Sequence, residues 1–323
     1  MREFYSVRTD LAIESGPVDE EQSGVEITRE TFVGGNITRV RVLNEQGAQR
    51  FNKPPGLYIT LECQSIAEED ADLRHEVSQQ IAKELENLWP ISTRAAHRAA
   101  TILVVGLGNW HVTPDALGPK VVQELLVTRH LLEHAAQGLD EGLQSVCAIA
   151  PGVLGLTGIE TGEIILGIVE KVRPHMVIAV DALASRSVER VGTTVQMTDT
   201  GISPGSGIGN KRKALTRETL GVPVIAIGVP TVVYAATIAR EAVEQALAAM
   251  VGLSHAEGAG ARRPTLSKEM RQDLLQNILS PHAENLVVTP KEIDSIINNM
   301  SKVIAGGLNA GLHPNLYLGE ALS

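Results

Sequence analysis

Four short apolar segments decide the fold: TILVV (101–105), SVCAI (145–149), MVIAV (176–180) and VPVIAI (222–227). Helical patterns lie between or after them, over residues 117–136, 159–172 and 231–250. Continuous apolar strands that alternate with helices are typical of a parallel sheet with both faces covered. The segments therefore predict a doubly wound, mostly parallel α/β sheet with helices on both faces. Functional polar groups are expected at the carboxyl ends of its strands.

The N-terminal third is expected to add a small β element to this core. Residues 25–29 and 37–42 alternate apolar and polar side chains around GGN (34–36), which predicts a β-hairpin. A further strand is expected over residues 57–63, followed by an amphipathic helix over residues 68–89.

Two C-terminal helices are expected, over residues 266–279 and 290–312. The second has Thr289 as its predicted N-cap and Pro290 at its first position. We expect the core to occupy about residues 100–250, with a C-terminal helical extension over residues 265–313.

Composition excludes several classes of protein. The chain has 28 basic and 38 acidic residues and a net charge of −10, which argues against a general affinity for nucleic acid. Its first 16 residues carry charge throughout and have no apolar core segment, unlike a signal peptide. The longest apolar run, residues 222–233, is broken by Gly228 and Pro230 and is too short to span a bilayer. We therefore expect a cytoplasmic protein that binds neither membrane nor nucleic acid.

Two aspartates stand out because they follow predicted buried strands. Asp115 lies in VGLGNWHVTPDALGP (105–119), and Asp181 directly follows MVIAV. In an open parallel sheet both positions fall on the crevice side, where ligands bind. Structural roles are the alternative: Asp115 as a helix N-cap, and Asp181 as a cap or as the ion-pair partner of Arg186 or Arg190.

Two carboxylates that face one crevice can divide the work of hydrolysis. Like charges close together push the two pKa values apart, so one group stays protonated while the other is ionised. The ionised group can activate a water, and the protonated group can donate to the carbonyl oxygen or to the leaving group. The identities of acid and base belong to the coupled pair.

The segment DTGISPGSGIGNKRK (199–213) is a second candidate region. Its glycines would let backbone amides approach a ligand closely, and a basic triplet follows them at once. One interpretation is an oxyanion or carboxylate pocket, and the other is a surface loop with solvated cations. The residues concerned are Gly205, Gly207, Gly209, Lys211, Arg212 and Lys213.

Familiar cofactor motifs are missing from the sequence. Neither GxxxxGK[ST] nor GxGxxG occurs. The histidines lack zinc-site spacing, and Cys63 and Cys147 sit singly in apolar runs as small hydrophobes. We therefore predict no metal and no cofactor.

Six long segments resemble the germination protease family of spore-forming bacteria. They are VVGLGNWHVTPDALGPKVV, APGVLGLTGIETGEII, AVDALASRSVERV, TGISPGSGIGNKRK, VPVIAIGVPTVV and VTPKEIDSIINNMSKVIAGGLNAGLH. The similarity runs from YSVRTDLAIE near the start to GGLNAGLH near the end. It implies an atypical aspartic endopeptidase that forms a homotetramer and is distantly related in fold to the hydrogenase maturation proteases. The aspartates of its TPDALGP and (I/V)DALA motifs, which the resemblance implies to be catalytic, are Asp115 and Asp181 here.

The resemblance also implies a zymogen that cuts off a short propeptide at a site imitating its substrate. That site reads acidic, bulky apolar, Ala, apolar or Ser, acidic, and DLAIE (10–14) fits it. Cleavage is therefore expected between Asp10 and Leu11, which leaves a single protease domain over residues 11–323. The alternative is a frayed terminus with an accidental match.

The expected activity is the cleavage of small acid-soluble spore proteins after Glu or Asp, in the forespore or spore core. Asn109 and the glycines at 205, 207 and 209 are candidate donors to the oxyanion. The triplet at 211–213 is the candidate partner for the acidic side chain before the scissile bond. Two alternatives stay open: a hydrogenase-maturation-type endopeptidase, and a non-catalytic phosphate- or nucleotide-binding protein of the same fold.

Overall fold

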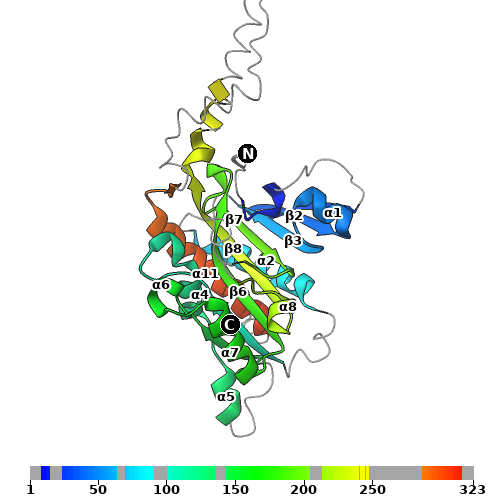
Figure 1. Ribbon diagram of the computed structural model, residues 1–323, viewed down its shortest axis with the longest axis vertical. Coiled ribbons are helices and arrows are strands. Elements are labelled where there is room, and N and C mark those ends of the chain that lie inside the picture. The colour runs from blue at the N-terminus through cyan, green and yellow to red at the C-terminus, as the bar shows by residue number, and fades with distance from the viewer. Residues whose placement is uncertain are drawn as a thin grey trace, which may run out of the picture.

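The computed structural model describes residues 9–14, 24–63, 70–90, 100–134, 143–203, 213–239, 241–243, 245–246 and 286–314. These residues form one nine-stranded mixed sheet with helices packed on it (Figure 1). The helix expected over residues 266–279 and the segment 204–212 lie outside the described residues. None of the helices in the described part of the chain has both the length and the hydropathy needed to cross a membrane.

The four apolar segments form the parallel half of the sheet. They are β4 (Thr101–Gly106), β5 (Ser145–Ile149), β6 (Met176–Ser185) and β8 (Val224–Tyr234). β4 pairs in parallel with β5 and β6, and β6 pairs in parallel with β8. These pairings confirm the four predicted strands. Each segment is apolar on both of its faces, as expected in a sheet that is covered on both sides.

The other half of the sheet is antiparallel. It contains β1 (Val25–Phe32), β2 (Gly35–Val42), β3 (Gly56–Glu62) and β7 (Thr194–Thr198), in that order, and β7 joins it to β8. Three of the eight strand pairings are parallel and five are antiparallel. The expectation of a mostly parallel sheet is therefore wrong, and β1 and β2, which pair as a hairpin, belong to the same sheet as the parallel strands. β7 (TVQMT) connects the antiparallel half to β8. Its residues are all buried, but three of the five are polar, so the sequence did not indicate a strand there.

Helices cover both faces of the sheet. α2 (Ala71–Leu88), α4 (Leu117–Glu124) and α11 (Ile293–Leu312) pack on one face, and α7 (Thr161–Val172) and α8 (Arg217–Leu220) on the other. β6 serves both, since Ile178 and Val180 point into the first core and Val177 and Ala179 into the second. α11 lies within the main core, packed against α2 and α4, rather than in a peripheral extension.

Two expected helix starts are wrong. β8 continues through Thr231 to Tyr234, because its backbone pairs with β6 and with β9 (Val287–Val288). α11 begins at Ile293 with Glu292 at its N-cap. Thr289 instead donates its hydroxyl to the Thr231 carbonyl at 2.8 Å.

Short elements complete the described chain. The expected helix over residues 117–136 is divided into α4 and α5 (Arg129–His134). Helical residues also follow β8 at 235–239, 241–243 and 245–246, within the helix expected over residues 231–250. Other short helices are α1 (Glu45–Phe51) and α6 (Leu154–Thr157), and the 3-10 turns are η1 (Ala12–Glu14), η3 (Thr113–Asp115) and η4 (Val188–Arg190).

Candidate active site

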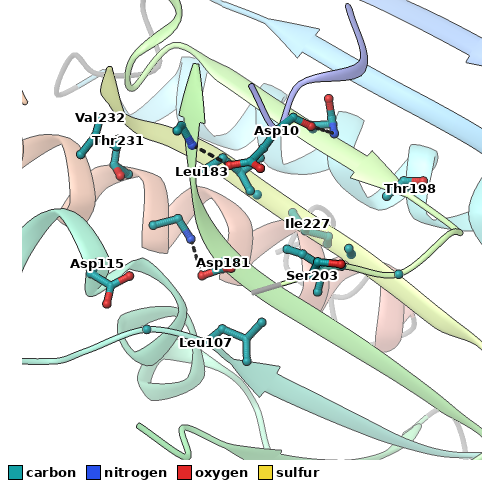
Figure 2. A pocket seen from close by; sticks show the side chains of 18 of the residues that line it. Asp10, Leu107, Asp115, Asp181, Leu183, Thr198, Ser203, Ile227, Thr231 and Val232 are labelled. Atoms are coloured by element: carbon teal, nitrogen blue, oxygen red, sulfur yellow. Dashed lines mark hydrogen bonds between the residues drawn. The ribbon is translucent and has the colours of Figure 1, made fainter. Parts of the chain in front are cut away.

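A cavity of about 500 Å³ opens at the carboxyl ends of β4, β6 and β8. Asp115 and Asp181, the two aspartates singled out from the sequence, both line it, and so does Asp10. Figure 2 shows Asp115 on η3, Asp181 on β6 and Asp10 above Asp181 in the view. We call this space the carboxylate cavity.

Asp181 lies within β6 and is 6% exposed. Its Oδ1 accepts a hydrogen bond from the backbone N–H of Ala182 at 2.9 Å. Across the sheet it pairs with Gly228 of β8, which also lines the cavity and adds no side chain beside the carboxylate. The ion pairs of Arg190, which sequence reasoning offered as a partner for Asp181, go to Glu14 and Glu62.

Asp115 ends η3, in the loop that follows β4. Gly108 makes this loop possible: its φ is +117°, and a Cβ there would lie 1.9 Å from the Asp115 carbonyl oxygen. The same oxygen accepts from the Asn109 N–H at 3.0 Å. α4 begins at Leu117 with Ala116 as its N-cap, so Asp115 is not the cap of that helix.

The other candidate site residues lie elsewhere. Among the described residues, Asn109 and Lys213 are outside the lining of the cavity. The Asn109 side-chain oxygen accepts from the His111 N–H at 3.0 Å, which stabilises the loop. Lys213 is exposed and packs beside Gly162. The remaining candidates, Gly205, Gly207, Gly209, Lys211 and Arg212, lie outside the described residues.

Residues 9–14, which we call the leader segment, are packed against the sheet. The Asp10 N–H donates to the Ala184 carbonyl at 3.1 Å, and the Ala184 N–H donates to Asp10 Oδ2 at 2.9 Å. Leu11 and Ala12 are both 0% exposed. The DLAIE segment (10–14) is therefore packed against the sheet and is not a frayed terminus.

Glu14 fixes the far end of the leader segment. Its side chain is 3% exposed and accepts from Arg190 Nη1 at 2.8 Å and from the Arg186 N–H at 2.7 Å. The Thr9 hydroxyl donates to the same carboxylate. Burial alone would lower the pKa of Arg190, but its hydrogen bonds to Glu14 and Glu62 raise it.

The carbonyl of Asp10 receives two donors from the antiparallel half. Lys53 Nζ lies 2.8 Å from this oxygen and Gln196 Nε2 lies 3.1 Å from it. Burial lowers the pKa of Lys53, while the charge of Asp10 acts in the opposite direction. Sequence reasoning missed both residues. The one available signal was a glutamine inside the short run TVQMT, which ordinary strand patterns do not single out.

Known proteins that are similar to this chain belong to one family. Residues 7–265 and 259–321 match the model of the germination protease family. The germination protease of Caldanaerobacter subterraneus subsp. tengcongensis is 47% identical over 96% of this chain and 95% of its own. The germination protease of Clostridium acetobutylicum is 45% identical over 98% of both chains, and that of Bacillus cereus is 44% identical over 96% and 94%.

Among solved structures, a [NiFe] hydrogenase maturation protease from Thermococcus kodakarensis aligns with 55% of this chain and 90% of its own. Its TM-score is 0.26 and its identity 17%. The sequence relatives, in contrast, are similar along nearly their whole length. The chain therefore belongs to the germination protease family of peptidases.

Proposed function

We propose that this chain is the zymogen of an atypical aspartic endopeptidase that begins the digestion of small acid-soluble spore proteins during germination. Cleavage would follow Glu or Asp, and the enzyme would act in the spore core as a homotetramer. Family membership supports the peptidase activity. The proposed aspartic mechanism and self-cleavage rest on the carboxylate cavity, which is lined by Asp115, Asp181 and Asp10 from three separate parts of the chain.

Asp115 and Asp181 would act as one acid–base pair. The ionised carboxylate takes a proton from a water, and the resulting hydroxide oxygen forms a bond to the carbonyl carbon of the scissile peptide. The protonated carboxyl then gives its proton to the departing nitrogen as the C–N bond breaks. This route yields a carboxylic acid and an amine, leaves one proton shared by the two aspartates, and uses no metal or cofactor.

The position of the leader segment supports self-cleavage between Asp10 and Leu11. Residues 10–14 have the order expected of a substrate, and Asp10 lines the cavity that is also lined by the two aspartates. An intramolecular substrate that is already bound reacts without the entropic cost of association. The same cavity would accept a spore protein once the leader has been cut.

The test starts from purified full-length protein, incubated over a pH series and weighed by mass spectrometry. We expect wild type to acquire Leu11 as its first residue and then to cut an added small acid-soluble spore protein after Glu or Asp. Asp115→Asn and Asp181→Asn should each slow both reactions by about 10²–10⁴-fold. Circular dichroism melting checks that the variants remain folded. Folded variants that cut at the wild-type rate would remove the two aspartates from the mechanism.

A further inference from the structure

Lys53 and Gln196 hold the peptide bond that the proposed function cuts. Both donate to the Asp10 carbonyl oxygen, at 2.8 and 3.1 Å, and they come from different parts of the chain. Effective oxyanion sites place their donors about 2.7–3.1 Å from the position of the developing negative charge. Two donors on a scissile carbonyl are what such a site requires.

The orientation of Gln196 is fixed by its second contact. Its Oε1 accepts from the Ala12 N–H at 2.6 Å, so the amide group must turn its NH₂ toward Asp10. One side chain thereby binds the backbone on both sides of the Asp10–Leu11 bond. Gln196 is 7% exposed within β7, which makes this geometry rigid.

Lys53 has a second relation to Asp10, because the two side chains carry opposite charges in a partly buried setting. The Asp10 carboxylate favours the charged form of Lys53. An acidic residue before the scissile bond thus meets a cation that also contacts its carbonyl.

We propose that Lys53 and Gln196 form a carbonyl clamp, which stabilises the oxyanion at the scissile bond and through Lys53 selects an acidic residue before it. When water attacks the carbonyl carbon, the C=O π electrons move onto the oxygen, and the two N–H donors stabilise that charge. When the C–N bond breaks, the electrons return and Leu11 leaves as an amine. The inference rests on the proposed self-cleavage at Asp10–Leu11.

The clamp could either assist cleavage or hold the bond away from the aspartates, and these two roles predict opposite changes in the rate when the clamp is removed. Asp10 is bonded to Ala184, three residues beyond Asp181 on β6, a span of roughly 10 Å along a strand. A clamp that assists chemistry loses rate when it is removed. A clamp that only holds the bond away from the aspartates gains rate, because the bond is then released toward them.

The test measures the first-order rate of self-cleavage in full-length protein. Gln196→Glu keeps the acceptor for Ala12 but removes the donor, and Lys53→Met removes the charge with little change in length. Each should slow cleavage by about 10²-fold or more. Lys171→Met, on an exposed lysine at the end of α7, is the matched control and should leave the rate unchanged. Melting curves identify any variant that fails to fold, and Lys53→Gln then replaces Lys53→Met.

A double-mutant cycle tests the selection of an acidic residue. Asp10→Asn should slow cleavage in the wild-type background and have no effect on the rate in Lys53→Met. Additive effects would overturn the selective role of Lys53, and unchanged or faster cleavage in folded Lys53→Met and Gln196→Glu would overturn the clamp. Failure of wild type to cut at all would instead contradict the proposed function, so the two failures are distinct.

Discussion

The two halves of the sheet divide the proposed site between them. The parallel half, β4, β5, β6 and β8, carries Asp181 within β6 and Asp115 in the loop that follows β4. The antiparallel half, β1, β2, β3 and β7, together with its loops supplies Gln196 and Lys53, which hold the leader segment. The groups expected to do chemistry thus lie on one half, and many of the groups that hold the segment lie on the other.

This division shows how a common α/β scaffold gains a binding surface. In a parallel sheet the crevice at the strand ends is set by topology, and side chains placed there need no further elements. A bound polypeptide needs more, because each of its backbone groups must find a partner. β7 meets this need, since it extends the sheet past β8 and presents Gln196 beside the crevice.

A buried charge should have the largest effect, and this effect should differ between the parallel half of the sheet and the leader segment. Ile178→Asp puts an unpaired carboxylate into the main core, where Ile178 is 0% exposed, at a cost comparable with the whole stability of a domain. Leu11→Asp puts the same charge into the equally buried leader segment. We expect Ile178→Asp to prevent folding and Leu11→Asp to abolish self-cleavage in a folded protein, as seen by circular dichroism and mass spectrometry. If Leu11→Asp also unfolds the chain, the leader is part of the core.

The antiparallel half has its own buried ion pair, which should govern stability and not cleavage. Arg39 of β2 binds Glu84 of α2 through Nη2 at 2.6 Å and Nε at 2.9 Å, and the Glu84 side chain is 0% exposed. Arg39→Met leaves that carboxylate buried without its partner and should cost about 3–5 kcal/mol in urea unfolding. Arg129→Met, which breaks the exposed pair with Glu133, should cost less than about 0.5 kcal/mol. Equal costs for the two variants would show that burial does not matter here.

A methyl group at Gly108 should disturb the parallel half locally. The positive φ and the 1.9 Å approach to the Asp115 carbonyl mean that Gly108→Ala must move the loop that carries this aspartate. We expect a loss of about 1–3 kcal/mol in stability together with slower self-cleavage. Gly155→Ala is the control, because a Cβ there meets nothing within 4 Å. Retention of full activity in Gly108→Ala would show that the position of Asp115 is not critical.

The smallest expected effect is on the pH dependence of the free energy of unfolding. Two buried groups, His313 and Glu84, should contribute to it in different pH ranges. His313 is 0% exposed, and burial lowers its pKa below 6.5, although the hydrogen bond to the Leu126 carbonyl opposes this shift. As the pH falls from 6.5 toward that lowered pKa, the unfolded chain binds a proton that the folded chain does not, so stability falls. The slope is at most about 1.4 kcal/mol per pH unit. His313→Gln should flatten urea midpoints measured between pH 7 and 5, and an unchanged slope would assign the effect to another group.

Glu84 provides the comparison at lower pH. Burial would raise its pKa, but hydrogen bonds from Arg39, Asn87 and Gln80 lower it below 4.5. Its contribution to stability is complete above pH 4.5 and is lost as the pH falls through the lowered pKa. Glu84→Gln should therefore remove pH dependence only below about 4.5, outside the range of His313.

The strands with one dominant hydrophobic pattern could be predicted from the sequence. The strand whose polar residues line the cavity could not. The apolar strands and the positions of Asp115 and Asp181 could be predicted, because continuous apolar runs specify a covered parallel sheet. β7 could not, since Thr194, Gln196 and Thr198 suggest an exposed loop until their partners are known. The pattern that begins at Thr231 likewise predicts a helix, but pairing with β6 and β9 keeps β8 extended there.

The sequence by itself determined the parallel core, the two aspartates at its edge and the substrate-like DLAIE segment, because local pattern and motif order are written along the chain. Only the tertiary structure decided what this segment touches. Lys53, Arg190 and Gln196 lie 43, 176 and 186 residues from the leader residues they bind, and no spacing in the sequence relates such positions. Strand order brings them together, because β7 joins the two halves of the sheet beside the cavity where the leader enters.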